Sequence, residues 1–138
     1  MNITLEHIAI WTNQLEVMKE FYVRYFMGVP NAKYINPHKG FESYFLTFRS
    51  GARLELMQRN DIPVNQNDTI ERQHLCIIHL AFGVDSMKEV DEKAEELRSA
   101  GVQILSGPRR TGDGYYEFET LDPDNNRLEV ITRWAELD

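Results

Sequence analysis

The sequence predicts an α+β fold built from two copies of one module, each ordered strand, helix, strand, strand, strand. Three observations predict it: landmarks that recur in both halves, a helical spacing of apolar residues near the start of each half, and alternation of apolar and polar residues elsewhere. The 138 residues suffice for one domain, whereas a module of about 60 residues buries little surface alone. We therefore expect one domain over residues 1–138, its modules packed together or each against a module of a partner chain.

The same sequence features recur in the same order in both halves, and the distance between counterparts varies only from 72 to 74 residues. His7 and His79 are 72 residues apart, and Glu55 and Glu129 are 74 apart. Between them, apolar residues follow helical spacing in both halves, at Leu15, Met18, Tyr22 and Tyr25 and again at Met87, Val90, Ala94 and Leu97. Chance does not produce such an ordered set, so the halves are expected to share one fold.

The first module is expected over residues 1–59. Its expected elements are a strand at 4–12, a helix at 14–26 and strands at 33–37, 42–49 and 53–59. Asn13 and Glu16 have the spacing of a capping box at the helix start. Gly28 follows the helix, where a left-handed cap residue is common, and Ser50–Gly51 supplies the last turn.

The second module is expected over residues 75–133, after a polar connector at 60–74 that is long for a linker and suited to act as a lid. Its expected elements are a strand at 76–85, a helix at 87–100 and strands at 102–105, 114–121 and 127–133. Ser86 and Glu89 predict a capping box, and Gly101 predicts the left-handed cap. Residues 122–126 form the last turn, and Cys76 is expected in the strand core.

Strand alternation places four chemically useful side chains on the faces turned away from the helices. His7 and Glu55 lie opposite the aliphatic positions of their strands, and His79 and Glu129 do the same in the second module. Two imidazoles and two carboxylates suit a divalent first-row metal ion. Taken singly, such a Glu is more typical of a solvated strand face and such a His of a hydrogen-bonded core residue than of a metal ligand. The repetition of both in the two halves favours a site.

Composition excludes several classes of function. Fifteen Lys and Arg against 22 Asp and Glu give a net charge of −7, which argues against binding to nucleic acid or to anionic lipid. The single cysteine excludes a disulfide within the chain. No signal peptide or membrane-spanning apolar run is recognisable, so we expect a cytoplasmic protein.

The chain resembles the vicinal oxygen chelate superfamily, which includes glyoxalase I, fosfomycin-resistance enzymes, extradiol dioxygenases and bleomycin-resistance proteins. The resemblance rests on LEHIAIWTNQLEVMKEFYVRYFMG, RLELMQR, IHLAFGVDS and LDPDNNRLEVI, and spans nearly the whole chain. The last motif has Asn125 or Asn126 where glycine is frequent, and asparagine tolerates the left-handed conformation. The resemblance implies an eight-stranded, cupped mixed sheet with helices outside and a divalent metal in its cavity.

The resemblance also implies site residues and an activity. The metal ligands would be His7, Glu55, His79 and Glu129, a set that resembles bacterial glyoxalase I, also called lactoylglutathione lyase. Glu129, or Glu55, would be the base of a lyase or isomerase that moves a proton through a metal-bound enediolate. The ion would be Ni, Zn, Co or Mn, with iron fitting the set less well, and the protein would be a homodimer.

Three functions stay open on this basis. The leading one acts on a hemithioacetal, such as a glutathione adduct, or a related α-hydroxycarbonyl compound. The alternatives are an Fe(II) ring-cleaving dioxygenase and a non-catalytic, drug-binding resistance protein. Arg109 and Arg110, flanked by glycine-rich turns, fit either a mobile cationic rim for an anionic substrate or a charged surface turn.

Overall fold

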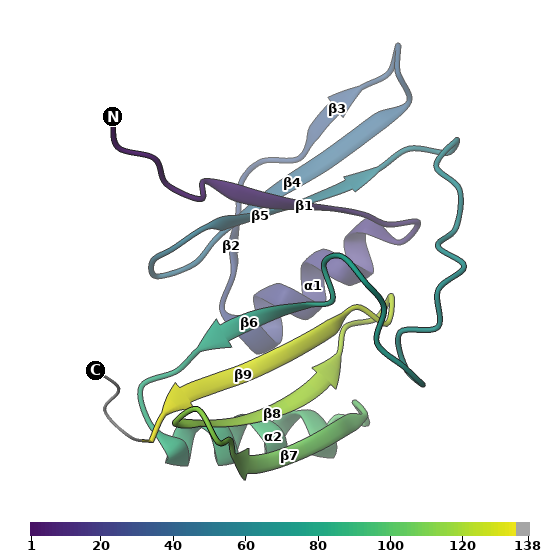
Figure 1. Ribbon diagram of the computed structural model, residues 1–138. Coiled ribbons are helices and arrows are strands. Elements are labelled where there is room, and N and C mark those ends of the chain that lie inside the picture. Colours follow the sequence, from purple (N-terminus) through teal and green to yellow (C-terminus); the bar gives the residue numbers. More distant parts are fainter. Residues whose placement is uncertain (135–138) are drawn as a thin grey trace. The chain divides into compact units, whose positions relative to one another are not determined.

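The computed structural model describes residues 1–134 and divides the chain into two compact units, with the boundary between Asn65 and Gln66. Each unit contains one sheet and one helix, and the two are described separately below (Figure 1). Each has the strand–helix–strands order of the predicted module, so the prediction of two βαβββ-like modules is confirmed.

The first module is a five-stranded mixed sheet with one helix. Its elements are β1 (His7–Trp11), α1 (Leu15–Phe26), β2 (Val29–Pro30), β3 (Tyr34–Asn36), β4 (Phe41–Thr47) and β5 (Arg53–Gln58). The strand order is β1-β5-β4-β2, and β3 pairs with the other half of β4. β1 is parallel to β5, because the chain crosses through α1 before it returns, and the other pairs are antiparallel. The two-residue β2 was not expected from the sequence.

Helix α1 covers one face of this sheet with an apolar stripe. Its buried residues are Leu15, Met18, Phe21 and Tyr22, three of them at predicted positions. They pack against a sheet face that carries Leu46, Leu54 and Leu56, which are almost wholly excluded from water. Leu54 and Leu56 alternate with Arg53, Glu55 and Met57, so Arg53 and Glu55 occupy the face opposite α1.

The ends of α1 differ from the prediction. The residue before the helix is Gln14, whose side chain makes no capping hydrogen bond, so Asn13 and Glu16 do not form a capping box. Instead the Gln58 side chain, from β5, accepts from the backbone N–H of Leu15 at 2.9 Å. At the other end Met27, not Gly28, adopts the left-handed conformation, with φ 59°.

Gly28 is needed for a different reason. A Cβ there would lie 3.3 Å from the Phe48 ring and 3.4 Å from the carbonyl oxygen of Tyr22. The small residue therefore allows the chain to turn closely past the end of α1.

The second module repeats the plan with a four-stranded sheet. Its elements are β6 (His79–Gly83), α2 (Met87–Ser99), β7 (Ile104–Arg110), β8 (Tyr115–Leu121) and β9 (Arg127–Arg133). The strand order is β6-β9-β8-β7, with β6 parallel to β9 and the other pairs antiparallel. Asn125 has φ 65° in the turn before β9, as expected for asparagine in the place of glycine.

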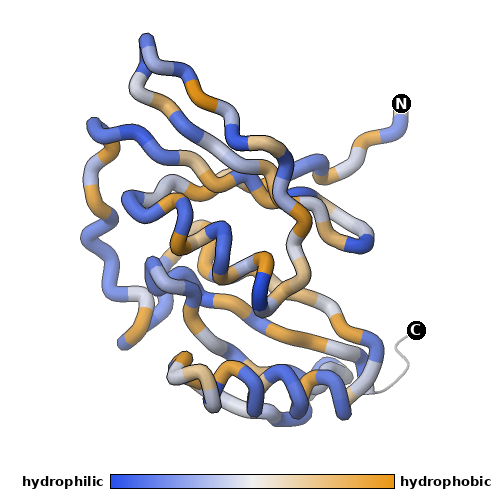
Figure 2. The backbone as a smooth tube through the Cα atoms, turned by 180° about the vertical axis from the view of Figure 1, so that it is seen from behind, coloured by the Kyte–Doolittle hydropathy of each residue, from blue (hydrophilic) through white to orange (hydrophobic). Residues whose placement is uncertain are grey.

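Helix α2 follows the sequence closely. The Ser86 side chain accepts from the backbone N–H of Glu89 at 3.2 Å, and the Glu89 carboxylate accepts from the N–H of Asp85 at 2.8 Å. Val90, Ala94 and Leu97 are buried against the sheet, while hydrophilic residues alternate with them along the helix (Figure 2). Gly101, with φ 83°, follows the helix in the left-handed conformation that was predicted.

Two expectations for the second module were wrong. The third element is not a short strand at 102–105 but β7, which continues through Gly107–Pro108 to Arg110, so Arg109 and Arg110 belong to a strand and not to a turn. β6 begins at His79, and Cys76 before it is exposed with φ 82°, outside any strand core. No helix among residues 1–134 is long and apolar enough to span a membrane.

Candidate functional site

In the first module, strand register brings His7 and Glu55 together. His7 pairs with Arg53 and Ala9 pairs with Glu55, so the His7 and Glu55 side chains are diagonal neighbours on the face opposite α1. Nε2 of His7 lies 3.7 Å from Oε1 of Glu55, which is mostly enclosed. The His7 ring also stands edge-on to Phe45, with centroids 5.2 Å apart.

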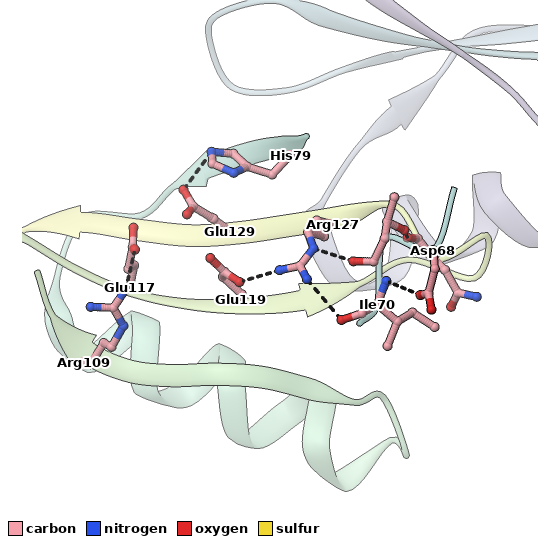
Figure 3. A network of polar contacts seen from close by, with 10 residues as sticks. Asp68, Ile70, His79, Arg109, Glu117, Glu119, Arg127 and Glu129 are labelled. Atoms are coloured by element: carbon pink, nitrogen blue, oxygen red, sulfur yellow. Dashed lines mark hydrogen bonds and ion pairs between the residues drawn. The ribbon is translucent and has the colours of Figure 1, made fainter. Parts of the chain in front are cut away.

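The second module makes the same contact with the equivalent residues. His79 pairs with Arg127 and Ala81 with Glu129, and Nε2 of His79 lies 3.2 Å from Oε1 of Glu129 (Figure 3). Glu129 is only 8% exposed. Burial raises the pKa of the Glu129 carboxyl, and the nearby His79 imidazole opposes that rise.

The His79–Glu129 pair stands in an acidic neighbourhood that the sequence analysis missed. Glu119 is directly opposite Glu129 in the β8–β9 ladder, and Glu117 lies two residues before it on the same face. Burial raises the pKa of Glu117, while the Arg109 guanidinium, 3.8 Å away, opposes the rise. Alternation along 115–121 would have placed both glutamates on the face of Glu129 had the strand register been known.

Arg127 ties the end of the connector to this network. Its Nη1 donates to Glu119 at 3.0 Å, its Nη2 to the carbonyl of Ile70 at 3.1 Å, and its Nε to the carbonyl of Thr69 (Figure 3). The Thr69 hydroxyl in turn donates to the carbonyl of Asn125 at 2.8 Å. The last part of the connector is therefore held to the second module by a buried arginine.

The structure thus forms two His–Glu pairs, His7–Glu55 and His79–Glu129, one in each unit. Each offers an imidazole nitrogen and a carboxylate oxygen from neighbouring parallel strands, and this donor set fits a divalent first-row metal. Among residues 1–134, no three or more His, Cys, Asp or Glu side chains gather in an arrangement ready to hold an ion.

The sequence matches the profile of the Glyoxalase/Bleomycin resistance protein/Dioxygenase superfamily over residues 4–130. The chain belongs to this superfamily. Both His–Glu pairs therefore lie within the superfamily match. A further similarity is to YqjT, an uncharacterized protein of Bacillus subtilis strain 168, with 34% identity over 64 residues; the match spans 42% of this chain and half of that protein's length.

Solved structures of the superfamily share the fold at low identity. A glyoxylase/bleomycin resistance protein/dioxygenase domain from Frankia gives a TM-score of 0.79 at 17% identity, covering 96% of this chain and 99% of that one. The trypanothione-dependent glyoxalase I of Leishmania major gives 0.75 at 21% identity, covering 95% and 87%. The fosfomycin resistance protein FosX of Listeria monocytogenes, solved with Mn(II), gives 0.70 at 21%, covering 99% and 96%.

Proposed function

We propose that this protein is a divalent-metal-dependent lyase or isomerase of the glyoxalase I type. The observation that carries the proposal is the repeated His–Glu contact: the same two residue types meet at equivalent register positions in both modules. A structural role would have to require that contact twice. His7, Glu55, His79 and Glu129 are the proposed ligands, and the metal is Ni, Zn, Co or Mn.

The substrate is a hemithioacetal, such as a glutathione adduct, or a related α-hydroxycarbonyl compound. A divalent ion held by these residues would polarise the substrate carbonyl and acidify the neighbouring C–H bond. Glu129 is the proposed base that takes the carbon-bound proton and returns it to the adjacent carbon. Its enclosed position raises its pKa, and Glu55 is the second candidate for this role.

The working unit is proposed to be a cytoplasmic homodimer that binds a small-molecule substrate. The Leishmania protein is a trypanothione-dependent glyoxalase I and the Listeria protein a fosfomycin resistance protein, so proteins of this fold act on different small molecules. The acidic composition fits a substrate other than nucleic acid.

Metal content tests the proposal first. Untagged protein, purified without chelator, is analysed by elemental mass spectrometry as wild type, as Glu55→Ala/Glu129→Ala and as the surface control Glu92→Ala/Glu95→Ala. We expect wild type and control to carry one Ni, Zn, Co or Mn per chain and the site variant to carry none. Iron would redirect the assignment to dioxygen chemistry, and no metal after reconstitution would favour a binding protein.

Turnover tests the base. Glu129→Gln keeps an oxygen ligand but cannot accept the proton, so we expect kcat on the methylglyoxal–glutathione hemithioacetal to fall by roughly 10²–10⁴-fold. Thioester formation is followed by ultraviolet absorbance, with metal content measured on the same sample. Activity near that of wild type would remove Glu129 from the role of base.

A further inference from the structure

The first module carries a cluster of exposed and partly exposed aromatic rings that the proposed chemistry does not use. Trp11 and Phe41 stand edge to face with centroids 6.0 Å apart, and Tyr34 lies 6.0 Å from Phe41. Trp11 is 38% exposed and Tyr34 52%, whereas core aromatic residues such as Tyr22 are fully enclosed. Grouped, solvent-facing rings of this kind mark binding surfaces more often than core packing.

The aromatic cluster (Trp11, Tyr34 and Phe41) is on the same sheet face as His7 and Glu55. Alternation along β1 puts Trp11 on the side of His7, and Trp11 pairs with Met57, two residues after Glu55 on β5. On β4, Phe41 alternates in phase with Phe45, which contacts the His7 ring. Ala9 lies between His7 and Trp11 on this face, and Met57 lies beside Trp11 on β5. Apolar side chains therefore connect the His–Glu pair to the rings.

The second module lacks this cluster at the equivalent positions. Gly83 stands where the first module has Trp11, with open space around it, and Arg109 stands where it has Tyr34. Tyr115 takes the place of Phe41, so one ring of the three is kept. A ring cluster needed by the fold itself would be expected in both modules. Its restriction to one module indicates a role in recognition that only that module performs.

We propose that the aromatic cluster binds an aromatic ring carried by the substrate at a distance from its reacting oxygens. This inference rests on the proposed function, because it places the reacting end of the substrate at the His–Glu pairs. The rings offer both faces and edges for stacking, and the Arg59 guanidinium, 5.2 Å above the Trp11 ring, covers one side of it. The substrate class is then an α-hydroxycarbonyl compound with a flexible chain that ends in an aryl group.

Strand geometry sets the length of that chain. Trp11 lies four positions after His7, which corresponds to about 13 Å along a strand. A phenyl group attached directly to the reacting carbonyl is too short to reach the cluster. A linker of several methylene groups lying over Ala9 and Met57 would span the distance.

A series of hydroxamic acids tests the inference. Their two vicinal oxygens imitate the reacting end of the substrate, and the enzyme does not turn them over. Cobalt-loaded protein is titrated with hydroxamates that carry a phenyl ring after two, four or six methylene groups, and with alkyl hydroxamates of equal carbon number. The Kd is taken from calorimetry and from the cobalt absorption. We expect the longer phenyl compounds to bind about 3–10-fold tighter than their alkyl matches, and the shortest to show no preference.

Conservative variants locate the effect. Trp11→Leu and Phe41→Leu keep apolar volume but remove a ring, and each should abolish the phenyl preference while acetohydroxamate binds as in wild type. Trp134→Leu is the matched control, because Trp134 is 41% exposed and also lies under a guanidinium, that of Arg110. In a Trp134→Phe background Trp11 is the one tryptophan of the chain, and the long phenyl compound should shift its fluorescence.

The outcomes separate this inference from the proposed function. Binding of all hydroxamates with no phenyl preference at any length would overturn the aromatic site and leave the metal proposal standing. Failure of every hydroxamate to perturb the cobalt spectrum would count against the metal site, while the Trp11 fluorescence response would still report ring binding. If acrylamide quenches the Trp11 fluorescence less as the protein concentration rises, a second copy of the chain covers the cluster. That result would also overturn the inference.

Discussion

At the scale of single residues, the two His–Glu pairs are alike in type but differ in their surroundings. Phe45 lies beside His7, and Arg53 lies over the Phe45 ring at 4.2 Å. In the second module the place of Phe45 is taken by Glu119, with Glu117 close by. Burial raises the pKa of the Glu129 carboxyl, and the carboxylates of Glu117 and Glu119 add to that rise while His79 opposes it.

The buried carboxyl of Glu117 makes stability depend on pH. Because burial raises its pKa in the folded chain, the stabilisation from protonation is complete below the ordinary value of 4.5 and is lost as pH rises through the raised one. Glu117→Gln fixes a neutral side chain. We expect the free energy of unfolding of metal-free protein to be unchanged near pH 4 and higher at pH 7, by roughly 0.2–1 kcal/mol.

Urea denaturation at the two pH values measures this difference. Glu71→Gln, which removes an exposed carboxylate from the same compact unit, is the control and should change neither value. A loss of stability at pH 7 in Glu117→Gln would mean that the contact with Arg109 outweighs the cost of burying the charge.

At the scale of elements, the last strand of each module begins with an arginine, but the two arginines make different contacts. Arg127 has a side chain only 9% exposed and holds the connector and Glu119, whereas Arg53 is 39% exposed and pairs with Glu6 at the surface. Arg127→Met would leave Glu119 and two carbonyls without their donor. We expect a loss of roughly 3 kcal/mol in the free energy of unfolding.

The repeat supplies the matched control. Arg53→Met removes the equivalent but exposed ion pair, so its cost should stay below about 1 kcal/mol. Hydrogen exchange should also quicken at residues 68–74 in Arg127→Met and not in Arg53→Met. Equal costs for the two variants, with no change in exchange, would show that Arg127 does not hold the connector.

The prediction of elements succeeded where the determinants are local. Ser86 and Glu89 form the expected capping box because both partners lie within one turn of α2. The predicted cap of α1 was wrong because the backbone N–H of Leu15 donates to Gln58, which is far away in sequence. β7 was also placed wrongly, since its glycine and proline favour a turn locally while pairing with β8 extends the strand through them.

The same contrast applies to the candidate site. Strand alternation placed His7, Glu55, His79 and Glu129 on the faces away from the helices, and the structure brings them together two by two. The roles of Glu117 and Glu119 depend on the β8–β9 register, which alternation within one strand does not give.

At the scale of the whole molecule, the internal repeat poses a question of stoichiometry. If the proposed metal takes ligands from both pairs, then removing either pair abolishes binding. If each module held its own ion, removing one pair would leave half of the metal in place. Two ligands alone make a weak site, which favours the composite one.

Paired variants test this directly. We expect His7→Ala/Glu55→Ala and His79→Ala/Glu129→Ala each to reduce metal content from about one per chain to near zero, and each to abolish the rise in Tm that excess metal gives the wild type. Half occupancy in either variant would contradict a composite site. Mixing the two variants under conditions that exchange subunits then distinguishes the remaining possibilities. If a site draws its two pairs from different chains, a mixed dimer contains one intact set and regains metal, whereas a site built within one chain regains none.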